Sequence, residues 1–154
     1  MGFTNIILEK RNGIAKITLN RPKVFNSTDK DTHLELQAAL GDIEKDEAVR
    51  VVVLTGTGKA FCSGADLGYV KGVVDKPKQM AEFLDLFHKT CDIIEKLSKP
   101  VIAAVNGIAL AGGLELVESC DLAIAAEEAR LGDQHATFGF VAAGGGTQRL
   151  PRLI

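Results

Sequence analysis

The chain has 154 residues, of which 46% are hydrophobic and 25% charged, with a formal net charge of −2. These values predict one folded domain with a hydrophobic core and argue against nucleic acid as a partner, since no block of lysine and arginine is present. The longest apolar run, residues 101–105, is too short to cross a bilayer, and the N-terminus lacks the features of a signal peptide. Three scattered cysteines without CxxC spacing predict reduced thiols in a cytoplasmic protein.

The N-terminal third predicts a hairpin followed by a helix. Within residues 6–19, two apolar-rich runs flank Asn12-Gly13, a pair that suits a tight turn with positive φ. A helix is expected to begin near Thr28, with Asp31 as its capping partner. Its apolar positions have helical spacing: Leu36, Ala39, Leu40 and Ile43.

The middle of the chain alternates buried strands with helices. Residues 50–54 predict an apolar buried strand, followed by a glycine-rich loop at 56–64 and a polar stretch that runs to Pro77. A second long helix follows and ends before Lys99-Pro100. Its apolar face consists of Met80, Phe83, Leu84, Phe87, Cys91 and Ile94.

The remaining segments continue the alternation. Residues 101–105 and 122–126 predict two further buried strands, separated by the Asn106-Gly107 turn and a short helix from Gly112 to Val117. Three glycines at 144–146 precede the first turns of another helix. This order of elements is typical of an α/β fold.

Two strand-to-helix turns, residues 61–67 and 106–115, are the best candidates for a ligand site. Small residues there let backbone N–H groups approach a ligand oxygen, and two such donors would form an oxyanion hole with Glu115 in the adjacent first helical turn. The alternative is that the small residues only permit tight packing of helix on strand. A dinucleotide fingerprint is weak because Phe61 stands where a third glycine is needed, and no metal-ligand spacing, P-loop or GxSxG elbow is present.

At these residues the chain resembles the crotonase superfamily. The matching segments are 58–67, 99–121 and 144–153, and the opening hairpin with the Asn-Arg-Pro-Lys run at 20–23 is similar too. The resemblance implies an α/β fold built as a spiral of β-β-α units. It also implies that residues 1–154 form the N-terminal core domain, that a C-terminal helical segment is missing, and that the protein assembles as a homotrimer or hexamer.

The resemblance further implies an acyl-CoA thioester as substrate, with coenzyme A as part of that substrate and no separate cofactor or metal. The N–H groups of Ala65 and Gly112 would polarise the thioester carbonyl, and Glu115 would help to activate the attacking water. The residues expected around the CoA moiety are Lys23, Val24, Ser63, Ala65, Asp66, Leu67 and Gly112.

The chain departs from the family pattern at two places: Ala142-Ala143 stands where a proline usually precedes the glycine run, and the other place is position 135. His135 stands where hydratases carry a second glutamate, and histidine also exchanges protons near pH 7.

Three hypotheses about function follow. The first is an enoyl-CoA hydratase or isomerase that uses Glu115 and His135. The second is a crotonase-fold hydrolase that cleaves a C–C bond of a β-dicarbonyl compound with His135, for which Asp133 is a possible partner. The third is a non-catalytic CoA-binding or assembly subunit, with His135 in a structural role.

Overall fold

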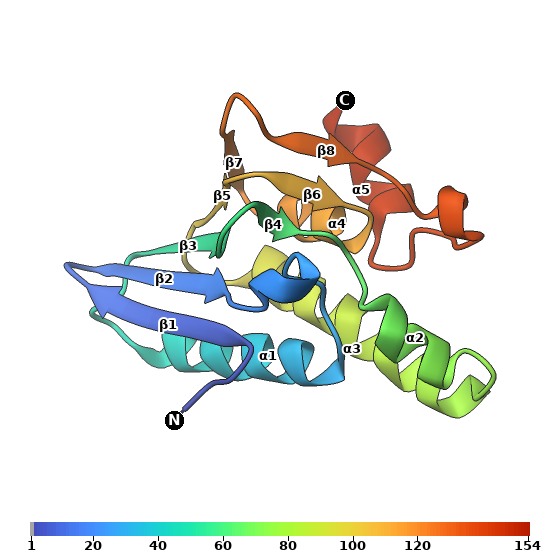
Figure 1. The fold of residues 1–154 in the computed structure, drawn as a ribbon. Helices are drawn as coiled ribbons and strands as arrows, with labels where there is room; N and C mark the ends of the chain where they lie inside the picture. The colour runs from blue at the N-terminus through green and yellow to red at the C-terminus, as the bar shows by residue number, and fades with distance from the viewer. Residues whose placement is uncertain (1) are drawn as a thin grey trace.

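A computed structural model of the chain describes residues 2–154 and has an α/β architecture (Figure 1). In chain order the elements are β1 (Ile6–Arg11), β2 (Ile14–Leu19), η1 (Pro22–Val24), α1 (Lys30–Lys45), β3 (Val51–Gly56), β4 (Ala60–Cys62), α2 (Leu67–Val73), α3 (Pro77–Lys96), β5 (Val101–Val105), β6 (Ile108–Leu110), α4 (Gly112–Glu118), β7 (Leu122–Ala125), β8 (Arg130–Gly132), η2 (Ala136–Phe138) and α5 (Gly146–Leu153).

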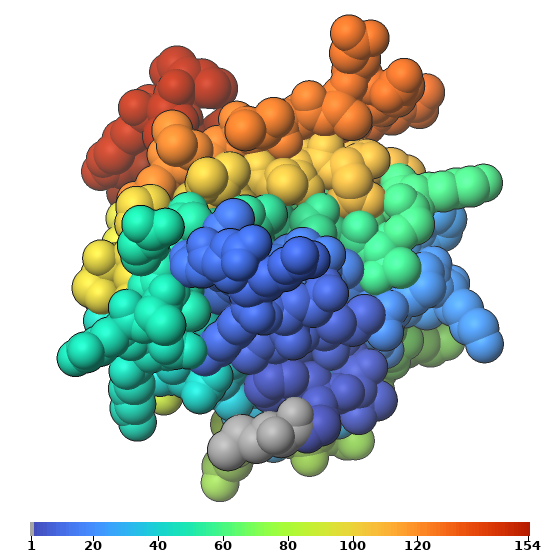
Figure 2. Space-filling view, turned by 90° about the vertical axis from the view of Figure 1, so that its left-hand side faces the viewer, coloured from blue at the N-terminus to red at the C-terminus, as the bar shows by residue number. Residues whose placement is uncertain are grey.

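The strands form two sheets that the chain visits alternately. One sheet has the order β1-β2-β3-β5-β7 and the other β4-β6-β8. All pairings are parallel except the β1–β2 hairpin, whose turn residues Asn12 and Gly13 have φ of 54° and 80°, as predicted. Each turn of the spiral therefore adds one strand to each sheet. Figure 2 shows the resulting stack, from the hairpin (blue) at the bottom to the last strands (orange) at the top.

The core lies between the larger sheet and the two long helices α1 and α3, which pack against each other. The predicted apolar face of α1 is buried, and so are Phe83, Phe87, Cys91 and Ile94 of α3. Burial raises the pKa of the Cys62, Cys91 and Cys120 thiols to about 12, 11 and 12. None of the three forms a disulfide.

The predicted start of α1 is wrong. The helix begins at Lys30, and its N-cap is Asp29, whose Oδ1 accepts a hydrogen bond from the Thr32 N–H at 2.9 Å. Thr28 is instead extended, and its N–H donates to the Gly64 carbonyl at 2.8 Å. The Asp29 carbonyl accepts the first helical hydrogen bond, from the His33 N–H, whereas the Thr28 carbonyl accepts the Asp66 N–H, so Asp29 is the cap and Thr28 belongs to the scaffold of the cavity described below.

Three further expectations are corrected by the structure. The loop expected at 56–64 contains β4, and the polar stretch up to Pro77 contains α2, capped by Asp66, whose Oδ1 accepts hydrogen bonds from the Gly68 and Tyr69 N–H groups. β7 forms, but all its residues are exposed, with Leu122 at 59% and Ile124 at 67%. β7 is the edge strand of its sheet, so its apolar residues do not gain the cover that a central strand receives.

His33 is fully buried between α1 and α3. Its Nδ1 lies 3.1 Å from the Thr90 hydroxyl, and its ring packs against Phe83 and Phe87. Burial lowers the pKa of His33 to about 4, and the charge of Asp29 opposes this only in part. The neutral ring is thus favoured in the folded protein.

This burial predicts a loss of stability in acid. Between the ordinary pKa of His33, 6.5, and its folded value of about 4, the unfolded state binds more protons, so the free energy of unfolding falls as pH falls. From neutral pH to about 4.5 the His33 contribution amounts to roughly 2 kcal/mol. Urea unfolding of wild type and His33→Gln across this range measures it. The variant should lose less stability than wild type, and parallel curves would contradict the prediction.

Candidate active site

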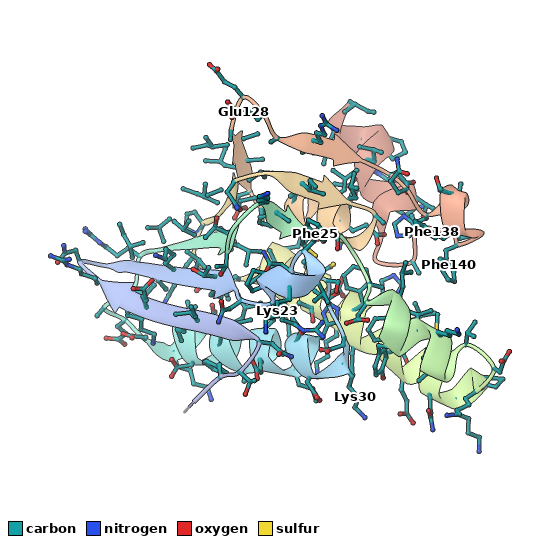
Figure 3. All side chains as sticks on the ribbon, in the orientation of Figure 1. Lys23, Phe25, Lys30, Glu128, Phe138 and Phe140 are labelled. Atoms are coloured by element: carbon teal, nitrogen blue, oxygen red, sulfur yellow. The ribbon has the colours of Figure 1, made fainter. Side chains whose placement is uncertain are left out.

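A cavity of about 700 Å³ opens between α2, α3, α4 and the segment that follows β8. One wall is apolar and comes mainly from α3, with Met80, Phe83, Leu84 and Phe87. Figure 3 labels Phe138 and Phe140 on the segment after β8, on the side of α2, and both contribute to the lining. The polar side chains of the lining include Glu115 of α4 and His135 of the segment after β8, which lie beside each other. The cavity suits a ligand with an apolar part and one reactive polar group.

The two turns singled out in the sequence meet at this cavity. A Cβ built on Gly64 would lie 3.1 Å from the Gly112 nitrogen, so the end of one turn touches the start of the other. Thr28 holds the first turn from both sides, because its N–H donates to the Gly64 carbonyl and its carbonyl accepts from the Asp66 N–H, each at 2.8 Å. Among residues 2–154, neither the Ala65 N–H nor the Gly112 N–H finds an acceptor, and both residues line the cavity.

The approach of α4 to β4 depends on residues with unusual backbone requirements. Ala111 precedes α4 with φ 49° and ψ −120°, a conformation that costs a residue with a side chain of the order of 1–3 kcal/mol. A Cβ on Gly113 would collide with the carbonyl oxygen of Cys62. The small residues of this turn therefore do permit tight packing of helix on strand, which was the alternative explanation for them. The same turn also leaves its N–H groups available to a ligand.

Glu115 is buried, with 2% of its surface exposed, and lines the cavity. Its Oε1 accepts a hydrogen bond from the Gly146 N–H at 2.8 Å, and its Oε2 lies 3.3 Å from His135 Nε2. Burial raises the pKa of Glu115 above its ordinary value, although the Gly146 N–H and His135 act in the opposite direction. A buried carboxyl group with a raised pKa beside a histidine is a candidate for acid–base chemistry.

His135 joins Glu115 to a second carboxylate. Its Nδ1 lies 2.6 Å from Asp133 Oδ1, and its backbone N–H donates to the same oxygen at 2.9 Å. The His135 side chain is 13% exposed and that of Asp133 47%. The structure thus brings the predicted pair Glu115 and His135 together and adds Asp133 on the solvent side.

Arg149 was missed by the sequence analysis. It lies on α5, where its Nη1 donates to the Gly144 carbonyl at 2.7 Å and its Nη2 to Glu95 Oε2 of α3 at 2.7 Å. The arginine therefore ties the glycine run to α3, and the same run supplies the Gly146 N–H that binds Glu115. The sequence shows only a basic residue just after a glycine run. This pattern does not indicate which groups the arginine side chain contacts.

The residues expected around a CoA moiety are placed as follows. Val24, Ser63, Leu67 and the turn residues Ala65, Asp66 and Gly112 line the cavity, whereas Lys23 is exposed on η1 outside the lining. Figure 3 labels Lys23 and Phe25 on this turn. The Asp66 carboxylate caps α2 and pairs with Arg21 at 2.9 Å, so its side chain serves the scaffold and its backbone remains for a ligand.

Within 2–154, no group of three or more His, Cys, Asp or Glu side chains has an arrangement that would hold a metal ion. No helix in that range combines the length and the apolar character that crossing a bilayer requires.

Comparison with known proteins identifies the class. The crystal structure of an enoyl-CoA hydratase from Bacillus anthracis matches with a TM-score of 0.94 and 44% identity, over 98% of this chain and 58% of that one. An enoyl-CoA hydratase from Polaromonas sp. JS666 matches with a TM-score of 0.93 and 31% identity, over 97% and 58%. The expected crotonase-like α/β spiral is thereby confirmed.

Sequence relatives give the family. The model of the enoyl-CoA hydratase/isomerase family matches residues 9–154. A crotonyl-CoA hydratase of Syntrophomonas wolfei and a short-chain-enoyl-CoA hydratase of Clostridium acetobutylicum are each 44% identical over 155 aligned residues, which cover all of this chain. The chain belongs to the enoyl-CoA hydratase/isomerase family. It spans 59% of the length of these two relatives.

Proposed function

We propose that this protein acts on an acyl-CoA thioester as an enoyl-CoA hydratase or isomerase, through an enolate held by backbone N–H groups. The observation that carries the proposal is the convergence of four groups on one cavity. The Ala65 and Gly112 N–H groups have no acceptor among the described residues, and Glu115 and His135 lie beside them. The two relatives described above are named crotonyl-CoA hydratase and short-chain-enoyl-CoA hydratase, which makes crotonyl-CoA the first substrate to test.

The geometry supports a different chemical role for each of these groups. Two N–H donors aimed at the thioester oxygen would stabilise the negative charge that develops there as the enolate forms. Glu115 would act as the general base or acid, because a buried carboxyl group with a raised pKa both takes and gives a proton. His135 would be its partner. The apolar wall contributed by α3 would hold the acyl chain, and coenzyme A would enter only as part of the substrate.

Further parts of the proposal concern the whole protein. We expect CoA to contact the turns that carry Val24 and residues 63–67, with Lys23 near the entrance, and residues 1–154 to act as one crotonase-like core domain. Exposed apolar residues on β7 support assembly into a trimer or hexamer. Three thiols without disulfides are consistent with a cytoplasmic enzyme of fatty acid metabolism.

A second candidate is favoured by one observation. Crotonase-fold hydrolases of C–C bonds carry an aspartate in the segment that matches residues 144–146, which are glycines here, and Asp133, whose Oδ1 lies 2.6 Å from His135 Nδ1, could take its place. In that case His135→Ala should abolish cleavage of a β-dicarbonyl substrate. A third candidate, a CoA-binding subunit without turnover, predicts affinity for CoA and no chemical conversion.

Mass spectrometry of a panel of enoyl-, hydroxyacyl- and β-oxoacyl-CoA thioesters after incubation with the protein separates these candidates. Addition of one water with an intact carbon skeleton is the expected result, and double-bond migration without a mass change, detected by chromatography, would indicate the isomerase. Addition of water with a split skeleton would favour the hydrolase. An unchanged panel together with CoA binding would support the subunit without turnover.

A further inference from the structure

We infer that Asp133 is a positioning residue, which holds the His135 ring with Nδ1 protonated so that Nε2 exchanges a proton with Glu115. The chemical consequence of this arrangement rests on the proposed function, whereas the arrangement itself is a property of the free protein.

The first support is the double contact between Asp133 and His135. A single oxygen, Asp133 Oδ1, lies 2.6 Å from His135 Nδ1 and accepts the His135 backbone N–H at 2.9 Å. One carboxylate thereby fixes both the backbone and the ring of the histidine. Because an ionised carboxylate only accepts hydrogen bonds, the contact at Nδ1 requires a proton on that nitrogen.

The second support is the state of the Glu115 carboxyl group. Its Oε1 is engaged by the Gly146 N–H, while Oε2 is buried without a well-oriented hydrogen-bond partner in the described chain. The nearest nitrogen is His135 Nε2 at 3.3 Å. A buried carboxyl oxygen is costly to leave without a partner, so proton transfer with this ring nitrogen, or a substrate water between them, satisfies it.

The third support is the gradient of exposure along the three side chains. Asp133 is 47% exposed, His135 13% and Glu115 2%. The imidazole therefore connects a carboxylate in contact with solvent to one that is buried at the reacting end of the cavity. A histidine can exchange a proton with Glu115 at this position more readily than a second buried carboxylate could, because two carboxylates at this distance would repel each other when both are ionised.

In hydration the protons balance as follows. The attacking water forms its C–O bond to the β-carbon of the substrate and gives its proton to Glu115 Oε2. The π electrons of the double bond move into the thioester as an enolate, whose oxygen faces the Ala65 and Gly112 N–H groups. Glu115 passes the proton from water to His135 Nε2, which carries none in the Nδ1–H tautomer. The enolate collapses as its α-carbon takes the proton from Nε2, and both side chains return to their starting state.

Nuclear magnetic resonance of the free protein tests the arrangement without any substrate. Long-range 1H–15N correlations of the three histidine rings, with His135 assigned from the His135→Gln variant, report which ring nitrogen carries the proton. In wild type above neutral pH we expect the Nδ1–H tautomer at His135, and in Asp133→Asn the Nε2–H tautomer. An Nε2–H tautomer in both proteins would overturn the inference.

Steady-state kinetics with crotonyl-CoA test the consequence. Asp133→Asn should lower kcat by roughly 10- to 100-fold with little change in KM, as expected for a group that orients another. The double variant Asp133→Asn/His135→Gln should be no slower than His135→Gln alone, since both changes interrupt the same path. Asp42→Asn is the matched control, because Asp42 has a similarly exposed side chain, 59%, that pairs with Lys10 away from the cavity.

The outcomes distinguish the positioning role of Asp133 from the proposed function of the protein. Additive losses in the double variant, or an Asp133→Asn enzyme as fast as wild type, would overturn the role of Asp133 and leave the hydratase assignment standing. A wild type without turnover would overturn the proposed function, while the tautomer of His135 would still decide whether Asp133 positions the ring.

Discussion

Glu115→Gln is expected to lower turnover of crotonyl-CoA by about 10²–10⁴-fold, the usual contribution of a positioned acid–base group. The amide keeps the size of the carboxyl group and can still accept the Gly146 N–H that Oε1 accepts at 2.8 Å. It cannot take a proton from water or pass one to His135 Nε2. The loss should therefore appear in kcat, with KM for the thioester little changed, in an assay that follows hydration at saturating substrate.

Glu118→Gln is the matched control for this experiment. Glu118 lies on the same helix, α4, one turn after Glu115, and is not among the residues that line the cavity. Burial, reinforced by the nearby Glu115, raises the pKa of Glu118 to about 7, so the control also removes a perturbed carboxyl group. Retained activity in Glu118→Gln and lost activity in Glu115→Gln would locate the effect in the cavity. Equal rates for Glu115→Gln and wild type would contradict the role given to Glu115.

The second large effect is expected from Gly113→Ala, which should reduce the free energy of unfolding by about 3 kcal/mol, the upper part of the range for overpacking. The added Cβ would meet the Cys62 carbonyl oxygen, and a backbone atom within β4 cannot move aside as a flexible side chain would. Either α4 moves away from β4 or the strand is distorted. Urea unfolding at neutral pH measures the change.

The same substitution at another glycine, Gly41→Ala, is expected to change stability in the opposite direction. Gly41 lies inside α1, and a Cβ there would meet nothing within 4 Å. Alanine in this open helical position should stabilise the protein by about 0.5–1 kcal/mol. Similar effects in both variants would contradict the argument, since the difference rests on the contact with Cys62. Loss of activity in Gly113→Ala at temperatures where it remains folded would further link this packing to the site.

The elements that could be predicted from the sequence are those with a local pattern. The hairpin around Asn12-Gly13 follows from turn residues between apolar runs, and both long helices follow from apolar positions at helical spacing. The start of α1 could not be settled in this way. Thr28, Asp29 and Asp31 all suit a helix terminus, and the pairing of Thr28 with Gly64, far along the chain, decides among them.

The second sheet could not be predicted because its strands have only three residues each and no detectable alternation. These strands are stabilised by their neighbours in the spiral, which are distant in sequence. The exposure of β7 has a related cause. Its apolar residues resemble those of a buried strand, but its position at the edge of the sheet is a property of the fold.

The candidate site was partly accessible from the sequence. The two turns and Glu115 follow from small residues and an acid at strand-to-helix positions, whereas the choice of Ala65 and Gly112 within the turns comes from the resemblance to crotonases. The structure places all three residues on one cavity. Asp133 was only a possible partner of His135 in the sequence, because spacing in a loop does not show where two side chains point. The same holds for Arg149, whose partners come from α3 and from the glycine run.

The raised pKa values of the three native thiols make the chain a convenient host for covalent labels. Maleimides and iodoacetamides react with thiolates, and burial keeps Cys62, Cys91 and Cys120 protonated at neutral pH. A single cysteine introduced at the exposed position Val141, on the rim of the cavity, would then be modified selectively without prior removal of the others. A fluorophore at that position would report arrival and departure of a thioester in real time.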